Sequence, residues 1–174
     1  MKQSFFKVIS NKRIAKNVYE MKLSGDTSPI ICPGQFVNIK IQGEFLRRPI
    51  SICDFDDETL TLIYKVVGKG TSIMSAMQEN TWLDILIALG NGFNTNESGE
   101  KPVLIGGGVG VPPMFKLAKE LIAEGKDVSV ILGFNKEEEI FYKEEFEKIG
   151  AKTYVTTVDG SVGTKGFVTD VLKD

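Results

Sequence analysis

The sequence contains no histidine and only two cysteines, Cys32 and Cys53. Without histidine, Ser-His-Asp and Cys-His catalysis, histidine metal sites and histidine acid–base chemistry are excluded. Two cysteines cannot make a four-cysteine zinc or iron–sulfur site, and they form no disulfide framework, which favours a reducing, cytoplasmic setting. We therefore expect no catalytic side chain and no metal site, and any redox chemistry must come from a bound cofactor.

Excess charge and long apolar runs are also missing. The 174 residues include 23 Asp+Glu and 21 Lys+Arg, a net charge of −2, which is too small to draw the chain to nucleic acid or an anionic membrane. No run approaches the roughly 20 apolar residues of a membrane helix, and the N-terminus lacks a signal-peptide pattern. With 42% hydrophobic and 25% charged residues, the composition is that of a folded domain acting without nucleic acid or membrane.

The first half predicts an antiparallel barrel or sandwich, because short β-prone segments alternate with turn residues. The expected strands are Ser4–Ile9, Val18–Leu23, Phe36–Ile41, Pro49–Cys53 and Leu60–Val67. A short helix is expected at Gly70–Met77, with Met74 and Met77 in the core. Cys53 and Trp82 are also expected to be buried.

Beyond a turn-prone stretch at Asn91–Lys101, strands and helices alternate, which is typical of a doubly wound parallel sheet. The expected strands are Val103–Ile105, Asp127–Gly133 and Ala151–Val158, and the expected helices are Pro113–Glu124, Ile140–Ile149 and one within Phe167–Leu172. Nucleotide-binding domains usually have about five or six strands, so this one is expected to be incomplete at its C-terminus. An unpaired edge on the first of these strands then predicts dimerisation or strand exchange.

Three motifs have the composition of anion-binding sites. Gly106-Gly107-Gly108-Val109-Gly110 lies between a strand and a helix, where backbone N–H groups approach a pyrophosphate, although a tight connection would also explain it. Arg47-Arg48-Pro49-Ile50-Ser51 offers a phosphate clamp and a nearby serine, or simply two surface arginines. Gly68-Lys69-Gly70-Thr71 joins a strand to a helix. Together they suggest two phosphate-bearing ligands.

In this order the motifs resemble ferredoxin–NADP reductase-like proteins, and among them the electron-transfer subunits of NAD-dependent dihydroorotate dehydrogenases. The matching runs are Arg47–Ile52, Val66–Thr71 and Val158–Gly163, and the resemblance covers nearly the whole chain. It implies an N-terminal FAD-binding β-barrel, residues 1–98, followed by a truncated doubly wound parallel α/β NAD-binding domain, residues 99–174.

The resemblance also implies the cofactor-binding residues. Arg48 would bind the FAD pyrophosphate or ribityl region, and Ser51 would lie near the flavin N5. The FAD set is Arg48, Pro49, Ile50, Ser51, Ile63, Tyr64, Lys65, Gly70 and Thr71, and the NAD set is Gly106, Gly107, Gly108, Gly110, Asp159 and Gly160. Ser161 would lie near the same nucleotide as Asp159 and Gly160. One lysine and three glutamates in Gly133–Glu139 favour NAD over NADP, unless they are only a solvated helix start.

The expected partner is an FMN-containing catalytic dehydrogenase subunit, in a heterotetramer that oxidises dihydroorotate in pyrimidine biosynthesis. Family members carry a [2Fe-2S] centre on a C-terminal cysteine cluster, and those cysteines are absent from this sequence. One alternative is the flavin subunit of an NADH-dependent ferredoxin–NADP reductase or of a sulfide- or hydrogenase-linked complex. Another is a non-catalytic module that senses NAD(H) or binds a partner.

Overall fold

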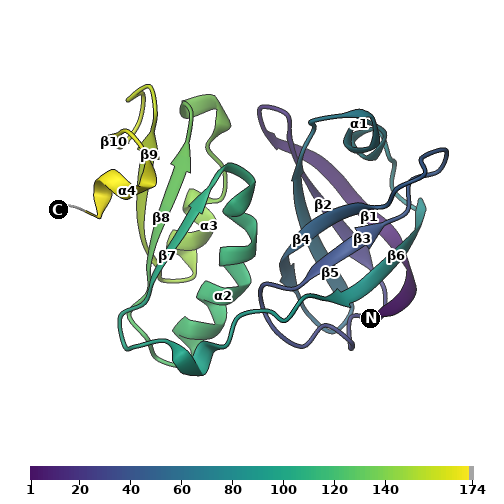
Figure 1. Cartoon of the computed structure of the whole chain (residues 1–174), viewed down its shortest axis with the longest axis horizontal. Coiled ribbons are helices and arrows are strands. Elements are labelled where there is room, and N and C mark those ends of the chain that lie inside the picture. The colour runs from purple at the N-terminus through teal and green to yellow at the C-terminus, as the bar shows by residue number, and fades with distance from the viewer. Residues whose placement is uncertain (173–174) are drawn as a thin grey trace. The chain divides into compact units, whose positions relative to one another are not determined.

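The computed structural model describes residues 1–172, which form two compact units divided after Phe93 (Figure 1). The boundary expected between residues 98 and 99 lies a few residues further along, in the same turn-prone stretch. The first unit contains six strands and a helix, and the second a parallel sheet with helices on both faces. The predicted fold class, a β-barrel followed by an α/β domain, is confirmed.

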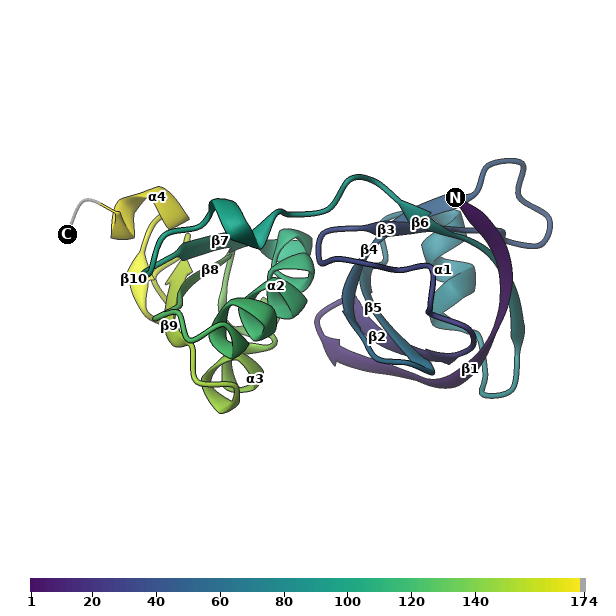
Figure 2. The same cartoon turned by 90° about the horizontal axis from the view of Figure 1, so that it is seen from below.

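Six antiparallel strands close the first unit into a barrel, and Figure 2 looks into the ring that they form. They are β1 (Lys2–Ala15), β2 (Val18–Ser24), β3 (Phe36–Ile39), β4 (Arg48–Phe55), β5 (Thr59–Lys65) and β6 (Trp82–Leu89). Around the ring the order is β1-β2-β5-β4-β3-β6, with β6 pairing back to β1. Closure leaves the sheet without an exposed edge, so the sandwich alternative is excluded.

Alternate side chains along each strand fill the barrel, as the two-residue period requires. Its core includes Phe6, Val8, Met21, Leu23, Val37, Ile39, Ile52, Leu60, Leu62, Ile85 and Ile87. Helix α1 (Lys69–Ser75) adds Met74 to this core, and Asn11 Nδ2 donates hydrogen bonds to the carbonyls of Met74 (2.9 Å) and Met77 (3.1 Å). Cys53 is buried as expected, but the expectation for Trp82 is wrong: its side chain faces outward from β6 and is 65% exposed.

The second unit is built on a parallel sheet of order β10-β9-β8-β7. Its strands are β7 (Val103–Gly107), β8 (Ser129–Phe134), β9 (Lys152–Thr157) and β10 (Thr164–Lys165). Helices α2 (Pro112–Ala123) and α3 (Lys143–Lys148) cover one face, and α4 (Val168–Val171) lies on the other (Figures 1 and 2). Short 3₁₀ turns occur at Thr95–Glu97, Gly108–Gly110 and Glu137–Glu139.

The last two residues of β8, Gly133 and Phe134, pack against segments on opposite faces of this sheet. The Phe134 ring meets the Phe141 ring edge-on at 5.3 Å, whereas Gly133 leaves room for α4, since a Cβ there would lie 2.5 Å from Val168 Cγ1. The helix expected from Ile140 begins only at Lys143, because Tyr142 has a left-handed backbone, φ 65°. Within residues 1–172, β7 pairs with β8 alone, as expected, and dimerisation through that edge stays a prediction.

Candidate functional site

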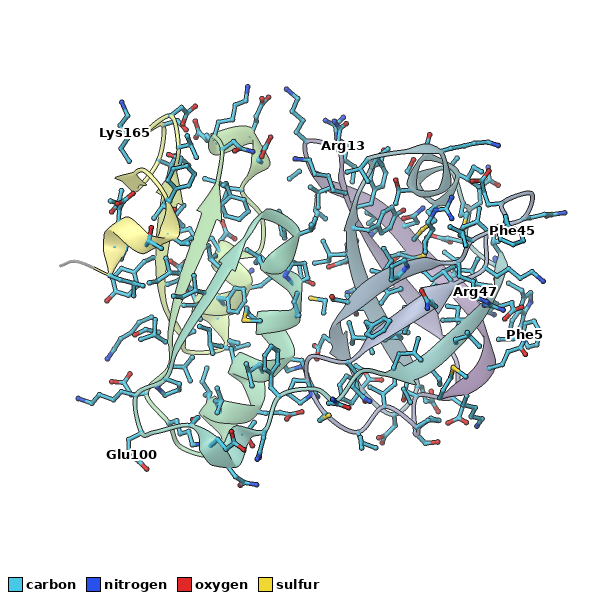
Figure 3. All side chains as sticks on the ribbon, viewed as in Figure 1. Phe5, Arg13, Phe45, Arg47, Glu100 and Lys165 are labelled. Carbon is cyan, nitrogen blue, oxygen red and sulfur yellow. The ribbon has the colours of Figure 1, made fainter. Side chains whose placement is uncertain are left out.

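The two adjacent arginines at the start of β4 have different surroundings. Arg47 Nη2 donates to both carboxylate oxygens of Asp84, at 2.9 and 3.0 Å, and Nη1 donates to the carbonyl of Asp84 at 3.0 Å. Figure 3 shows Arg47 near Phe5, the β1 residue that pairs with Asp84. Since its donors are used to tie the β3–β4 loop to β6, Arg47 is a structural residue.

Arg48 instead lies beside the turn that precedes α1. Its Nη2 donates to Glu44 Oε2 at 2.7 Å, and Nη1 donates to the carbonyl of Leu46. The guanidinium packs so closely on Gly70 that any side chain at residue 70 would collide with it. The structure therefore brings together two members of the expected FAD set, Arg48 and Gly70.

Thr71 holds the shape of this turn. Its buried hydroxyl accepts hydrogen bonds from the N–H groups of Val67 (3.0 Å) and Gly68 (3.2 Å) and donates to the carbonyl of Gly68 (3.1 Å). The hydroxyl is thus committed to the backbone. We infer that the Thr71 side chain shapes the turn. A contact between Thr71 and the diphosphate stays a prediction, and the group that would make it is the backbone N–H.

The register of β4 and β5 decides which predicted residues face outward. Ile52 pairs with Leu62, and both face the core, so their neighbours Ser51 and Ile63 face away from it. Pro49 and Lys65 share that outward direction by the same alternation. Ser51 Oγ makes no hydrogen bond within residues 1–172, which leaves a hydroxyl available on this face.

Ile50 and Tyr64 face the other way. Ile50 packs against the barrel core and Tyr64 is part of it, with its ring stacked on Tyr19 at 5.9 Å. The Tyr64 hydroxyl donates to Asn11 Oδ1 at 3.0 Å, and burial raises the pKa of the phenol. For these two residues, only backbone groups are available to a ligand on the outer face.

The residues around Arg48 fit an anionic group, because they already hold one. The Glu44 carboxylate lies between Arg48 Nη2 at 2.7 Å and Lys69 Nζ at 2.8 Å. Hydrogen bonding from Lys69, and then from Arg48, lowers the pKa of Glu44 below its usual value. Two cations converging on one carboxylate would equally suit a diphosphate.

The glycine run of the second unit lies at the carboxyl edge of the parallel sheet. Gly107 pairs with Gly133 at this edge. A Cβ at Gly106 would lie 2.8 Å from Val111 Cα, so the fold itself requires that glycine. At Gly107, Gly108 and Gly110 a Cβ would meet nothing within 4 Å. The backbone of these three is therefore uncovered, and added side chains would fill the space over the loop.

Helix α2 adds few donors of its own to this loop. Its first two residues are Pro112 and Pro113, which have no N–H group, and no side chain caps it. Donors for an anion must come from the glycine amides. Carboxyl edges of parallel sheets are where such folds bind nucleotides, so the loop fits a pyrophosphate.

A second turn at the same edge follows β9. Asp159 Oδ1 accepts hydrogen bonds from Ser161 N (2.9 Å) and Ser161 Oγ (2.7 Å), and Gly160 between them has φ 78°. Ser161 Oγ also accepts from the N–H of Glu137 at 2.9 Å, which ties this turn to the segment after β8. The structure thus places Asp159 and Gly160 beside the glutamates taken to favour NAD.

This turn gives a pH-dependent prediction. Hydrogen bonds from the side chain and backbone of Ser161 lower the pKa of Asp159, so its charged form stabilises the fold above the unfolded-state pKa of about 3.9. That contribution is lost as the pH falls through the lower folded-state pKa. Asp159→Ala is expected to lower the Tm at pH 7, and the difference from wild type should shrink below about pH 4. A difference that persists unchanged at low pH in thermal scans would contradict this.

Comparison with known proteins then supplies the family. Residues 104–174 match the sequence model described as "Oxidoreductase NAD-binding domain". The chain is 45% identical to the dihydroorotate dehydrogenase B (NAD(+)) electron transfer subunit of Geobacillus sp. strain WCH70, covering all of this chain and 70% of that protein. It is 46% identical to the subunit of the same name from Fusobacterium nucleatum, covering 95% of this chain and 67% of that one. The chain belongs to the family of dihydroorotate dehydrogenase B electron transfer subunits.

Solved structures of other flavin and ferredoxin reductases share the fold. One similar structure is an NADH-dependent reduced ferredoxin–NADP oxidoreductase, described as a flavin-based electron-bifurcating enzyme, with a TM-score of 0.86 and 30% identity over 97% of this chain and 62% of that one. The ferredoxin reductase of carbazole 1,9a-dioxygenase shares the fold, with a TM-score of 0.87 at 19% identity over 99% of this chain and 56% of that one. The chain spans about two thirds of the length of its dihydroorotate dehydrogenase B relatives.

Residues 1–172 contain no group of three or more His, Cys, Asp or Glu side chains arranged to hold a metal ion. In the same residues no helix is both long and apolar enough to cross a membrane.

Glu44 and Lys69 are the functional candidates that the expected site sets omit. Lys69 lies within the Gly68–Thr71 motif, so its position could be noticed in the sequence. Glu44 had no such signal, because nothing in the sequence shows that the β3–β4 loop folds against the turn before α1.

Proposed function

We propose that this chain carries FAD on its barrel unit and binds NAD on its α/β unit, and that electrons pass between a dihydroorotate-oxidising partner subunit and NAD⁺. One observation carries the proposal: a single chain of this family has two anion-binding sites. Arg48 and Lys69 form one, with Arg48 on the same strand as the outward-facing Ser51, and the exposed glycine loop Gly107–Gly110 forms the other. Each feature alone has an ordinary structural explanation. Together they suit two dinucleotides.

On the barrel, Arg48 and Lys69 would hold the FAD diphosphate, with Gly70 leaving room for the guanidinium. Ser51 lies three residues further along β4, about 10 Å away, where its Oγ would donate a hydrogen bond to the flavin ring. Lys65 on β5 would flank the ring on the same face; Ile63 also points to this face but is only 3% exposed. When bound, FAD supplies the hydride- and electron-transfer chemistry. The chain's own residues only bind and orient, which agrees with the lack of histidine.

On the α/β unit, the amides of Gly107, Gly108 and Gly110 would bind the NAD pyrophosphate, and the Asp159–Gly160 turn would lie against the nucleotide at the same edge. The extra phosphate of NADP would meet Glu137–Glu139, where like charge disfavours it. We therefore propose NAD as the nucleotide.

The partner that we propose is an FMN-containing catalytic subunit, in a heterotetramer. The name of the relatives supports it, because an electron transfer subunit implies a second subunit. A second candidate, the flavin subunit of an NADH-dependent ferredoxin–NADP reductase, is favoured by the similarity to that structure. The cytoplasmic location stays a prediction.

Binding and reconstitution test the proposal. Titration with FAD, followed by flavin fluorescence, should show one FAD bound per chain. Mixing the FAD-loaded protein with the dihydroorotate-oxidising subunit should give dihydroorotate-dependent reduction of NAD⁺. Failure to bind FAD would overturn the proposal, and NADH-dependent reduction of ferredoxin without dihydroorotate activity would favour the second candidate.

A further inference from the structure

The Glu44 carboxylate occupies the cation pair assigned to the flavin diphosphate. Its side chain is only 14% exposed, although the next two residues of the same loop, Phe45 and Leu46, are 100% and 67% exposed. A carboxylate drawn inward from such an exposed loop is held by its partners. Those partners are Arg48 and Lys69, at 2.7 and 2.8 Å.

Glu44 can leave this junction while Arg48 stays in place, and the Lys69 side chain, 76% exposed, already reaches solvent. Arg48 packs against Gly70 and donates a hydrogen bond to the carbonyl of Leu46. Glu44 Oε1 and Oε2 bind only these two cations within residues 1–172, and the residue lies on a loop. Rotation of the Glu44 side chain toward solvent would open both cations without moving the barrel.

The charges at this site determine whether the Glu44 carboxylate favours or opposes binding of a diphosphate. Arg48 and Lys69 bring two positive charges, which a diphosphate with two negative charges would neutralise. With the Glu44 carboxylate still in place, the same site would hold an excess negative charge in a half-buried setting. The carboxylate and the diphosphate therefore compete for one pair of cations.

We propose that Glu44 is a built-in competitor of the flavin diphosphate, which keeps the Arg48–Lys69 pair closed until FAD displaces it. This inference rests on the proposed function, since it assumes that FAD binds at Arg48. The opposite role, in which Glu44 orients Arg48 for the ligand, predicts the opposite change in affinity when the carboxylate is removed.

The test compares FAD dissociation constants of wild type, Glu44→Gln and Glu44→Ala by equilibrium fluorescence titration. Both variants should bind FAD about 3- to 10-fold more tightly than wild type at low salt, because two partly exposed ion pairs no longer oppose binding. The gain should shrink as KCl screens the charges. Glu58→Gln, in the turn between β4 and β5, is the matched control and should bind like wild type.

Equal or weaker FAD binding by both Glu44 variants would overturn the competitor role. If no protein, wild type included, binds FAD, the proposed function fails instead, and the two failures are thus distinguishable. Inorganic pyrophosphate, titrated calorimetrically, tests the competition for the Arg48–Lys69 pair independently of the flavin ring. Tighter pyrophosphate binding by Glu44→Gln would support it, and unchanged or weaker binding would overturn it.

Discussion

Replacing Arg48 with alanine is expected to weaken FAD binding by roughly 10- to 100-fold, because a guanidinium hydrogen bond to a charged group contributes about 1.5–3 kcal/mol. The barrel should remain folded. Arg48 contributes no side chain to the apolar core, and its partners are a loop carboxylate and a loop carbonyl. Fluorescence titration with FAD, together with urea denaturation of both proteins, measures the two effects separately.

The neighbouring arginine provides the matched control. Arg47→Ala removes four hydrogen bonds, two of them to the Asp84 carboxylate, whose side chain is 16% exposed. We expect the free energy of unfolding to fall by about 1–3 kcal/mol, with FAD affinity little changed in the folded protein. If Arg47→Ala lost FAD affinity while Arg48→Ala did not, the assignment of the diphosphate site would be wrong.

Gly107→Val is expected to weaken NADH binding by at least about tenfold without lowering the Tm. Gly107 has an extended backbone, φ −112° and ψ 129°, which valine accepts readily, and a Cβ there meets nothing within 4 Å. The fold therefore gains nothing from glycine at this position. The space above the loop is what a pyrophosphate needs in order to approach the amides.

Substitutions at two other glycines serve as controls that distinguish an effect on NADH affinity from an effect on stability. Gly99→Val, where a Cβ also meets nothing, lies outside the loop and should change neither NADH affinity nor Tm. Gly106→Ala should lower the Tm, because its Cβ would press on the backbone of Val111 and Gly110 at 2.8 and 2.9 Å. If Gly107→Val bound NADH as tightly as wild type does, the nucleotide would not lie over this loop.

Local sequence patterns predicted most of the fold. The glycine turns, the β-prone segments and the strand–helix alternation all depend on near neighbours, so they can be seen in the sequence. Strand β6 is missing from the predicted set, although its buried residues alternate, and Trp82 on its outer face was expected inside. A single aromatic side chain does not show which face of a strand it occupies.

The site was harder to predict, because it depends on register and on contacts between distant segments. Five consecutive residues of β5, Leu60–Tyr64, are buried, so no alternation in the sequence separates inward Tyr64 from outward Ile63. Nor does the sequence separate Arg47 from Arg48. Their different roles arise from Asp84 on β6 and from Gly70 in the first turn of α1, and only the closed barrel brings these residues to β4.

Electron transfer between the two dinucleotides is tested most directly by anaerobic addition of NADH to the FAD-loaded protein, followed by visible absorbance. The flavin band should bleach in wild type, and Gly107→Val should require much more NADH for the same bleaching. A flavin band that stays unchanged while NADH demonstrably binds would contradict the claim that this chain transfers electrons between its two dinucleotides.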